Sequence, residues 1–393
     1  MGRSKFFQKF AAKYSMNRKS KPFSLLVKPA SADCNLKCEY CFYLDRCELY
    51  PGSKIHRMSD DVLEKIISSY MQTEQPSYSF CWQGGEPTLM GLDFFTRVTE
   101  FQKKYGAAKS ATVANGLQTN AILINDEMAE HFAKHNFLIG VSLDGPEGIH
   151  NTYRKKKSGS GSHSDVLSAI EVLRRHKVEF NILVLVSRAN VAKCREVFSY
   201  LVEKGFFYHQ YNPCVEFDSK GKLLPFSKIG EEWGKILCEL TNCWLSAGSR
   251  KISIRLFDSI LNYLVYGIKN VCTMGRDCRQ YFVVEYNGDV YPCDFFVRKE
   301  LKLGNIMENS WEELLESEKY EIFGKKKCKL DSICEKCEFL SLCYGDCLKH
   351  RPPGDAFNPQ ALSSLCEGQK IFFRHSMAKL KNIAQKFIGE HKK

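Results

Sequence analysis

Three closely spaced cysteines form the segment of this chain best suited to redox chemistry. Cys34, Cys38 and Cys41 make a C-x₃-C-x₂-C run shortly after an apolar segment. Iron-sulfur clusters are held by sets of four thiolates, so three thiolates on one loop would leave one iron open to a ligand from outside the protein. Buried or zinc-bound thiols are the simpler alternative. The spacing predicts an iron-sulfur cluster with an open iron, where chemistry would take place.

Two polar segments farther along the chain are suited to a small charged ligand. The first consists of Gln83, Gly84, Gly85 and Glu86, and the second contains Ser142, Asp144 and Arg154. Glycines let the backbone approach a ligand closely, and a carboxylate accepts hydrogen bonds from an ammonium group. A hydroxyl, a carboxylate and a guanidinium together suit a zwitterion that also carries a ribose. Loop capping and surface ion pairs are the alternative for the second segment.

Alternating strands and helices position these residues between residue 23 and about residue 215. Apolar runs predict strands at residues 24–27, 78–82, 111–117, 137–143, 179–186 and 207–211. Amphipathic periodicity predicts helices at residues 59–71, 92–105, 126–135, 163–176 and 192–203. Repeated β-α units close into a parallel sheet or barrel, with sites at the carboxyl ends of the strands. The cysteine run and the two polar segments would therefore meet at one end of the sheet.

A second cysteine-rich block follows two further predicted helices, at residues 230–245 and 257–265. Its strongest local signal is a β-hairpin around Asn287 and Gly288. The block contains Cys272, Cys278, Cys293, Cys334, Cys337, Cys343, Cys347 and Cys366. Eight thiolates make two complete sets of four, which predicts two further clusters suited to moving electrons. A zinc ribbon at residues 334–347 is the alternative.

Bulk composition favours a folded chain in a reducing compartment. The chain has 393 residues, 44% of them hydrophobic, and 18 cysteines. We expect no membrane span and no secretory signal, and therefore a soluble, cytoplasmic protein. The formal net charge of +12 is concentrated at the two ends. These ends could be solvated helices, contacts to nucleic acid or a dock for an acidic electron donor.

The motifs together resemble known enzymes. The three-cysteine run, with Tyr40 before its last cysteine, and the segment at residues 83–87 resemble radical S-adenosylmethionine (SAM) enzymes. The cysteine block resembles their SPASM domain, and nearly the whole chain resembles the anaerobic sulfatase-maturating enzymes. The sequence segments that carry this resemblance are residues 34–43, 82–89, 117–120, 142–146, 179–182 and 291–295.

This resemblance implies an α/β fold in four parts. They are a basic N-terminal extension (1–22), a partial (β/α)₆ radical SAM barrel (23–250), a SPASM domain with a β-hairpin and two auxiliary clusters (251–370) and a basic C-terminal helix (371–393). SAM and three [4Fe-4S] clusters are the implied cofactors. Of the auxiliary clusters, one would take Cys272, Cys278, Cys293 and Cys347, and the other Cys334, Cys337, Cys343 and Cys366. Cys328 is an extra thiol beside them, and the other cysteines are assigned no role.

The same resemblance implies roles for single residues. The SAM contacts would be Tyr40, Gln83, Gly84, Gly85, Glu86, Ser142, Asp144 and Arg154. Ser142 and Arg154 would lie on the carboxylate side of SAM and Asp144 at its ribose. Tyr43 would contact substrate, and Asp294 would be the general base. Core packing for Tyr43, strand-end hydrogen bonding for Gln83 and a hairpin-end carboxylate for Asp294 are the alternatives.

The implied reaction is oxidation of a sulfatase Cys or Ser, in a Cys/Ser-x-Pro-x-Arg segment, to Cα-formylglycine. A 5′-deoxyadenosyl radical would take a hydrogen atom from Cβ, and the substrate would then lose a proton and an electron. The expected partners are an unfolded or nascent sulfatase and a flavodoxin- or ferredoxin-like donor, with no nucleic acid. A SPASM enzyme that crosslinks or epimerises another peptide is one alternative. A non-catalytic iron-sulfur or zinc protein that transfers electrons or binds nucleic acid is another.

Overall fold

A single sheet of ten strands runs through the computed structural model, which describes residues 22–107, 111–352 and 360–391. The strand order is β10-β9-β8-β1-β2-β3-β4-β5-β6-β7. Its parallel run comprises β1 (Ser24–Lys28), β2 (Tyr78–Trp82), β3 (Val113–Thr119), β4 (Leu138–Ser142), β5 (Glu179–Val186), β6 (Tyr208–Pro213) and β7 (Ser253–Ile254). The six predicted strands therefore exist, with ends shifted by two residues at most. The predicted basic extension, except for its last residue, lies outside the described residues.

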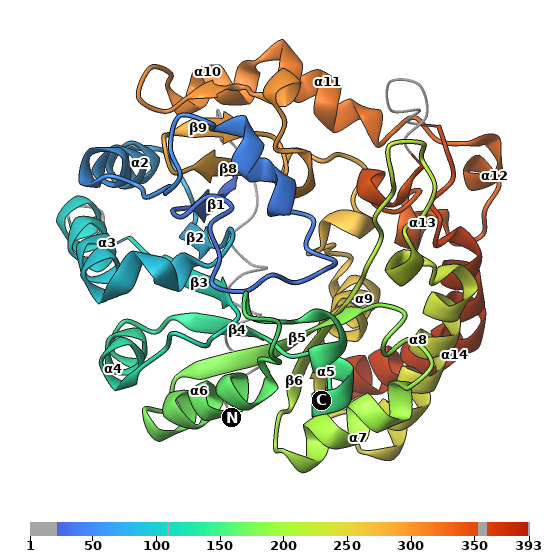
Figure 1. Cartoon of the computed structure of the whole chain (residues 1–393). Helices are drawn as coiled ribbons and strands as arrows, with labels where there is room; N and C mark the ends of the chain where they lie inside the picture. The colour runs from blue at the N-terminus through green and yellow to red at the C-terminus, as the bar shows by residue number, and fades with distance from the viewer. Residues whose placement is uncertain (1–21, 108–110, 353–359, 392–393) are drawn as a thin grey trace.

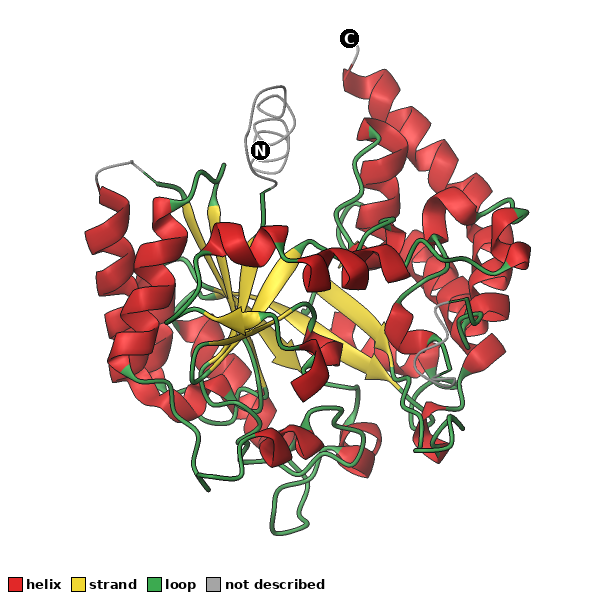
Figure 2. Ribbon diagram, turned by 90° about the horizontal axis from the view of Figure 1, so that it is seen from above, coloured by secondary structure: helices red, strands yellow, loops and turns green. Residues whose placement is uncertain are grey.

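Helices pack around the outside of the curved sheet (Figures 1 and 2). The five predicted between strands are α2 (Asp60–Gln72), α3 (Gly91–Gly106), α4 (Asp126–Lys134), α6 (His163–Arg175) and α7 (Cys194–Glu203). Local sequence explains their starts. Ser59 caps α2 by accepting from the backbone N–H of Val62, and Asn125 caps α4 in the same way. The helix α5 (Glu147–Tyr153), which was not predicted, follows β4.

The predicted hairpin joins the same sheet. Strand β8 (Tyr281–Glu285) pairs in parallel with β1, while β9 (Asp289–Tyr291) and β10 (Gly304–Asn305) continue antiparallel. Gly288 has a φ of +87°, which its place in the turn requires. The cysteine-rich block therefore contributes strands to the barrel sheet, directly beside the strand that leads into the three-cysteine run.

Three long helices cover the end of the sheet near β6 and β7 (Figure 1). They are α8 (Gly230–Ser246), α9 (Arg255–Tyr266) and α14 (Cys366–His391). Helix α14 begins five residues earlier than the predicted 371. Helices α8 and α14 come close at Gly234, where a Cβ would lie 2.1 Å from the carbonyl oxygen of Gly368. Within the described residues, no helix is long and apolar enough to cross a bilayer.

Short helices carry the rest of the cysteine-rich block. They are α10 (Trp311–Glu316), α11 (Glu318–Lys326), α12 (Ser332–Glu335) and α13 (Leu340–Cys343). Helix α10 has a complete capping box between Ser310 and Glu313. The 17 cysteines whose side chains the structure describes are all free thiols.

Candidate active site

The cluster loop, residues 34–41, follows β1 at its carboxyl end. Burial, together with nearby Glu86, Cys38 and Cys41, raises the pKa of Cys34 to about 12. Burial likewise raises the pKa of Cys38 to about 11, against the opposing effect of Arg154. These mutual effects mean that the three thiols lie near one another. Buried thiols become thiolates when a metal displaces their protons, so this donor set fits a cluster with three protein ligands.

Two glycines let the segment after β2 touch the chain that enters the cluster loop. The N–H of Gly85 donates to the Ser31 carbonyl at 2.6 Å, and that of Glu86 to the Asp33 carbonyl at 2.7 Å. A Cβ on Gly85 would lie 2.0 Å from the Asp33 carbonyl oxygen, and Gly84 has a φ of +143°. The sequence predicted a close approach to a ligand. The structure shows that these glycines also permit a backbone contact that positions the cluster loop.

We expect Gly85→Ala to displace the cluster loop, because the added Cβ meets backbone atoms that have no rotamer to change. Overpacking of this kind costs about 1–3 kcal/mol, and a 1 Å misplacement lowers activity by about 100-fold. SAM cleavage and the Tm of the iron-loaded protein measure the two effects. The control is Gly148→Ala in α5, where a Cβ meets nothing within 4 Å. Equal SAM cleavage in both variants would refute this role.

Glu86 is completely buried, and its carboxylate accepts four hydrogen bonds from the protein. Oε1 accepts from the N–H of Thr88 at 3.0 Å and from the hydroxyls of Thr88 and Thr119 at 2.7 Å each. Oε2 accepts from the N–H of Asn120 at 2.8 Å, and the Asn120 side chain donates to Cys34 Sγ at 3.8 Å. Burial raises the pKa of Glu86 despite these bonds. Glu86 therefore joins the ends of β2 and β3 beneath Cys34, and its contact with SAM stays a prediction.

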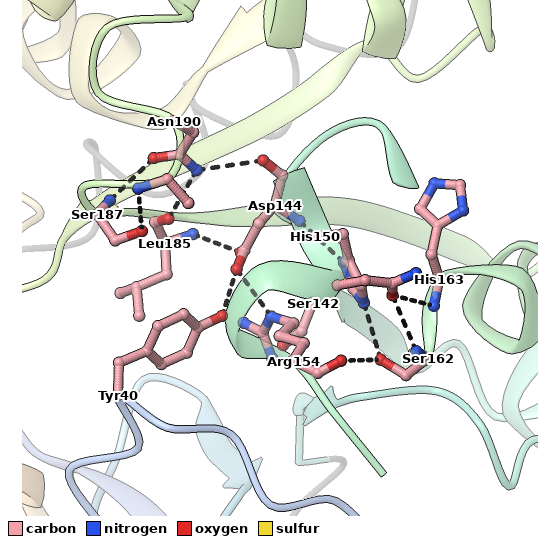
Figure 3. Close-up of polar contacts among 12 residues, drawn as sticks. Tyr40, Ser142, Asp144, His150, Arg154, Ser162, His163, Leu185, Ser187 and Asn190 are labelled. Carbon is pink, nitrogen blue, oxygen red and sulfur yellow. Dashed lines mark hydrogen bonds and ion pairs between the residues drawn. The ribbon is translucent and has the colours of Figure 1, made fainter. Parts of the chain in front are cut away.

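Asp144 binds two of the other predicted SAM residues (Figure 3). Its Oδ2 accepts from the Tyr40 hydroxyl and from Arg154 Nε, the latter at 3.1 Å, while Oδ1 accepts from the N–H of Leu185 at 2.9 Å. All of Tyr40, Asp144 and Arg154 are at least 92% buried. Arg154 also lies close enough to Cys38 to affect its pKa. This arrangement links the end of β4 to the cluster loop.

The neutral side chain of His150 supports this network through two hydrogen bonds. Burial lowers the pKa of His150 to about 3. Its Nδ1 accepts from the N–H of Asp144 at 3.3 Å, so the proton is on Nε2, which donates to the Ser162 hydroxyl at 2.9 Å (Figure 3). On the neighbouring strand, Gln118 Nε2 donates to the Ser142 hydroxyl at 3.1 Å. Ser142 at the end of β4 and Asp144 just after it are thus held by β3 and by α5.

Asp294 contacts residues from two other parts of the sheet, β1 and the end of β2. It follows Cys293 at the end of the hairpin, and its carboxylate forms an ion pair with Lys28 and accepts from Gln83 Nε2 at 3.1 Å. Lys28 is 0% exposed, and its Nζ lies 3.8 Å from the centroid of the Tyr43 ring. The ends of β1, β2 and the hairpin therefore bring the predicted base, Gln83 and Tyr43 together. Their roles in catalysis stay predictions.

Two charged residues at this edge were not predicted. The Tyr43 hydroxyl donates to Glu285, whose register partner across the β1–β8 pair is Lys28. Burial raises the pKa of Glu285, although Tyr43 and Lys28 act against this. The available signal was weak, because each is one charged residue at the end of an apolar strand. Only the pairing of β1 with β8 shows that they oppose each other.

The eight cysteines of the second block fall into two groups in space. In the first, burial raises the pKa of Cys347, with Cys272 and Cys293 adding to it, and Cys278 is raised to about 12 with contributions from Cys347 and Cys272. In the second, burial and Cys366 contribute to a pKa of about 12 for Cys343. The second group lines one pocket through Cys334, Cys337, Cys343 and Cys366. Each group supplies the four thiols that a complete iron-sulfur cluster needs. Among the described residues, no three His, Cys, Asp or Glu side chains are already arranged to bind one metal ion, so the ligand assignment stays a prediction.

Comparison with known proteins assigns the two halves of the chain. Residues 29–201 match the radical SAM superfamily, and residues 272–338 match SPASM, an iron-sulfur cluster-binding domain. The chain is 38% identical over 373 residues to the serine-type anaerobic sulfatase-maturating enzyme of Bacteroides thetaiotaomicron, covering 91% of this chain and 90% of that protein. It is 37% identical over 367 residues to the cysteine-type enzyme of Clostridium perfringens, covering 92% and 98%.

A solved structure agrees with these relatives. Native anSMEcpe with bound AdoMet and Cp18Cys peptide superposes with a TM-score of 0.86 at 36% identity, covering 93% of this chain and all of that one. Streptococcus suis SuiB bound to S-adenosylmethionine, at 16% identity and a TM-score of 0.62, shares the fold. The predicted fold class and enzyme class are confirmed. This chain belongs to the anaerobic sulfatase-maturating enzymes of the radical SAM superfamily.

Proposed function

We propose that this enzyme oxidises the side chain of one Cys or Ser in a sulfatase polypeptide to Cα-formylglycine. The observation that carries the proposal is the position of Asp294. This carboxylate is adjacent to Cys293 of the first four-thiol group. It is bonded to Lys28 and Gln83 at the carboxyl ends of β1 and β2. A proton acceptor beside an electron acceptor is what the second half of such an oxidation needs.

The cofactors are SAM and three [4Fe-4S] clusters. Bound at the open iron, SAM supplies hydrogen-atom abstraction from the substrate Cβ. Cys34, Cys38 and Cys41 hold that cluster, and the two four-thiol groups hold the auxiliary clusters. Arg154 and Ser142 hold the SAM carboxylate, Asp144 holds its ribose, and Glu86 together with backbone carbonyls of residues 83–86 holds its amino group.

Besides the SAM contacts proposed for them, Asp144 and Glu86 support this proposal through other residues. Both carboxylates are occupied by protein donors. Asp144 orients Tyr40 and Arg154 toward the SAM site, and Glu86 fixes the strand ends under Cys34. The Tyr43 side chain is held by its contacts with Lys28 and Glu285. It contacts the substrate side chain where that side chain approaches Asp294.

The substrate is an unfolded or nascent chain that presents a Cys/Ser-x-Pro-x-Arg segment, which the enzyme meets in the cytoplasm. The two relatives named above are of the serine and the cysteine type at nearly equal identity, so we propose both residues as candidate targets. A flavodoxin- or ferredoxin-like protein supplies the electrons.

A paired-peptide assay tests this function. Iron-reconstituted full-length protein is given SAM, a reductant and three peptides that carry Cys, Ser or Ala at the target position, under anaerobic conditions. Mass spectrometry should detect formylglycine from the Cys or the Ser peptide, in step with 5′-deoxyadenosine, and none from the Ala peptide. Deoxyadenosine formed without aldehyde from any of the three would refute sulfatase maturation and direct the search to crosslinked or epimerised peptides.

A further inference from the structure

A buried lysine lies where the two groups of four cysteines approach each other. Lys327 follows α11 and is 1% exposed. Its Nζ donates to the carbonyl oxygens of Cys272 at 2.6 Å and Thr273 at 2.9 Å. Among the described residues, no carboxylate forms an ion pair with it. Burying a charge without a counter-ion is costly, so the protein has a reason to place a cation here.

The charge of Lys327 reaches both cysteine groups. It acts to lower the pKa of Cys278 in the first group and of Cys343 in the second, although burial holds each pKa at about 12. Lys327 bonds the carbonyls of the turn at Cys272–Met274, and helix α13, which ends at Cys343, packs against that turn. Lys327 therefore lies close to both sets of thiols. Its chain position explains this, because it lies between α11, which packs beside the hairpin, and the loop that enters the second group.

Two further cations gather at the same place. Lys269 Nζ lies 4.4 Å from the centroid of the Tyr344 ring, and Arg276 Cζ lies 5.6 Å from it. Burial lowers the pKa of Lys269, and Lys327 and Arg276 lower it further. Like charges this close repel one another, so negative charge nearby would stabilise all three cations. Eight cluster thiolates provide such charge.

We propose that Lys327 raises the reduction potentials of both auxiliary clusters by stabilising their reduced forms. A cluster held by four thiolates is an anion that gains a further negative charge on reduction, so a fixed cation favours the reduced state. The inference deepens the proposed function and rests on its assignment of the two four-thiol groups as cluster ligands.

The consequence concerns the electron that leaves the substrate. After hydrogen-atom abstraction, the substrate loses one proton, to Asp294, and one electron, which reduces an oxidised auxiliary cluster. A higher potential at that cluster makes the transfer more favourable. Lys327 acts on the cluster and does not touch the substrate, so it is a positioning residue and not a catalytic one.

Potentiometric titration followed by electron paramagnetic resonance tests this role in the reconstituted full-length protein. We expect Lys327→Met to lower the midpoint potentials of both auxiliary clusters and to leave that of the SAM cluster unchanged. Lys327→Arg, which keeps the charge, should stay close to wild type. The matched control is Lys329→Met, two residues away and exposed. Iron and sulfide content establishes that each variant is fully loaded.

Unchanged auxiliary potentials in fully loaded Lys327→Met would overturn the proposal. If Lys327→Met does not take up its clusters, Lys269→Met replaces it and should lower the same midpoint potentials by a smaller amount. Unchanged potentials in Lys269→Met would also overturn the proposal. If wild-type protein carries two auxiliary clusters but makes no aldehyde, the proposed function is refuted. The shift in midpoint potential then still tests the role of Lys327. Wild-type protein without auxiliary clusters would overturn both.

Discussion

Asp294→Asn is expected to suppress formylglycine formation while SAM cleavage continues. The amide keeps the size of the side chain and its contact with Gln83, but it accepts a proton poorly. Loss of a positioned general base lowers the rate by about 10²- to 10⁴-fold. We expect SAM cleavage to depend on the cluster loop and on the Tyr40–Asp144–Arg154 network, which this change does not touch. The measurement is the ratio of aldehyde to 5′-deoxyadenosine.

The matched control for this experiment is Asp277→Asn. Asp277 also adjoins a predicted cluster cysteine, Cys278, but it is paired with Arg279 and does not contact Lys28. It should therefore keep the wild-type ratio of products. If Asp294→Asn and Asp277→Asn gave the same aldehyde yield, Asp294 would not be the base.

Replacing Cys34, Cys38 and Cys41 together with Ala is expected to abolish both products. The cluster loop is then left without thiol donors, so SAM has no open iron to bind. One of three four-iron clusters is lost, so iron content should fall by about one third. The auxiliary clusters should stay, because their eight cysteines lie in a separate part of the chain. Iron analysis and deoxyadenosine release measure the two effects.

A second triple variant separates ligand loss from general thiol loss. Cys194, Cys238 and Cys243 have no assigned role and lie around α7 and α8. Their replacement with Ala should keep the full iron content and deoxyadenosine release. Deoxyadenosine formed by the cluster-loop variant at the rate of this control would exclude the loop as the site of SAM cleavage.

The sequence was sufficient to predict the parallel part of the fold because each element has a strong local signal. Helix α2 has a serine cap, an acidic first turn and apolar residues on one face. Strand β5 was predicted with the boundaries that the structure has. Helix α5 was missed, because it is short and its first turn was read as part of the ligand-binding segment.

The candidate site was only partly predictable, because its remaining members depend on pairings between distant segments. Lys28 and Glu285 oppose each other through the β1–β8 pair, and no local pattern encodes that pairing. Lys327 is one lysine in a row of three and is the buried member of that row. Similarly, Gly85 looked like a ligand contact, whereas its tight packing against Asp33 needed three-dimensional coordinates.

The pairing of β1 with β8 also sets an order of events during synthesis. Strand β1 leaves the ribosome about 250 residues before β8, which corresponds to roughly 10 to 50 s at ordinary rates of translation. Throughout that time the edge of β1 that pairs with β8 in the folded protein has no partner. The cluster loop that follows β1 is not yet covered by the hairpin. The barrel therefore cannot be completed before the cysteine-rich block exists, and oxygen or a stray metal ion has its easiest access to the loop in this interval.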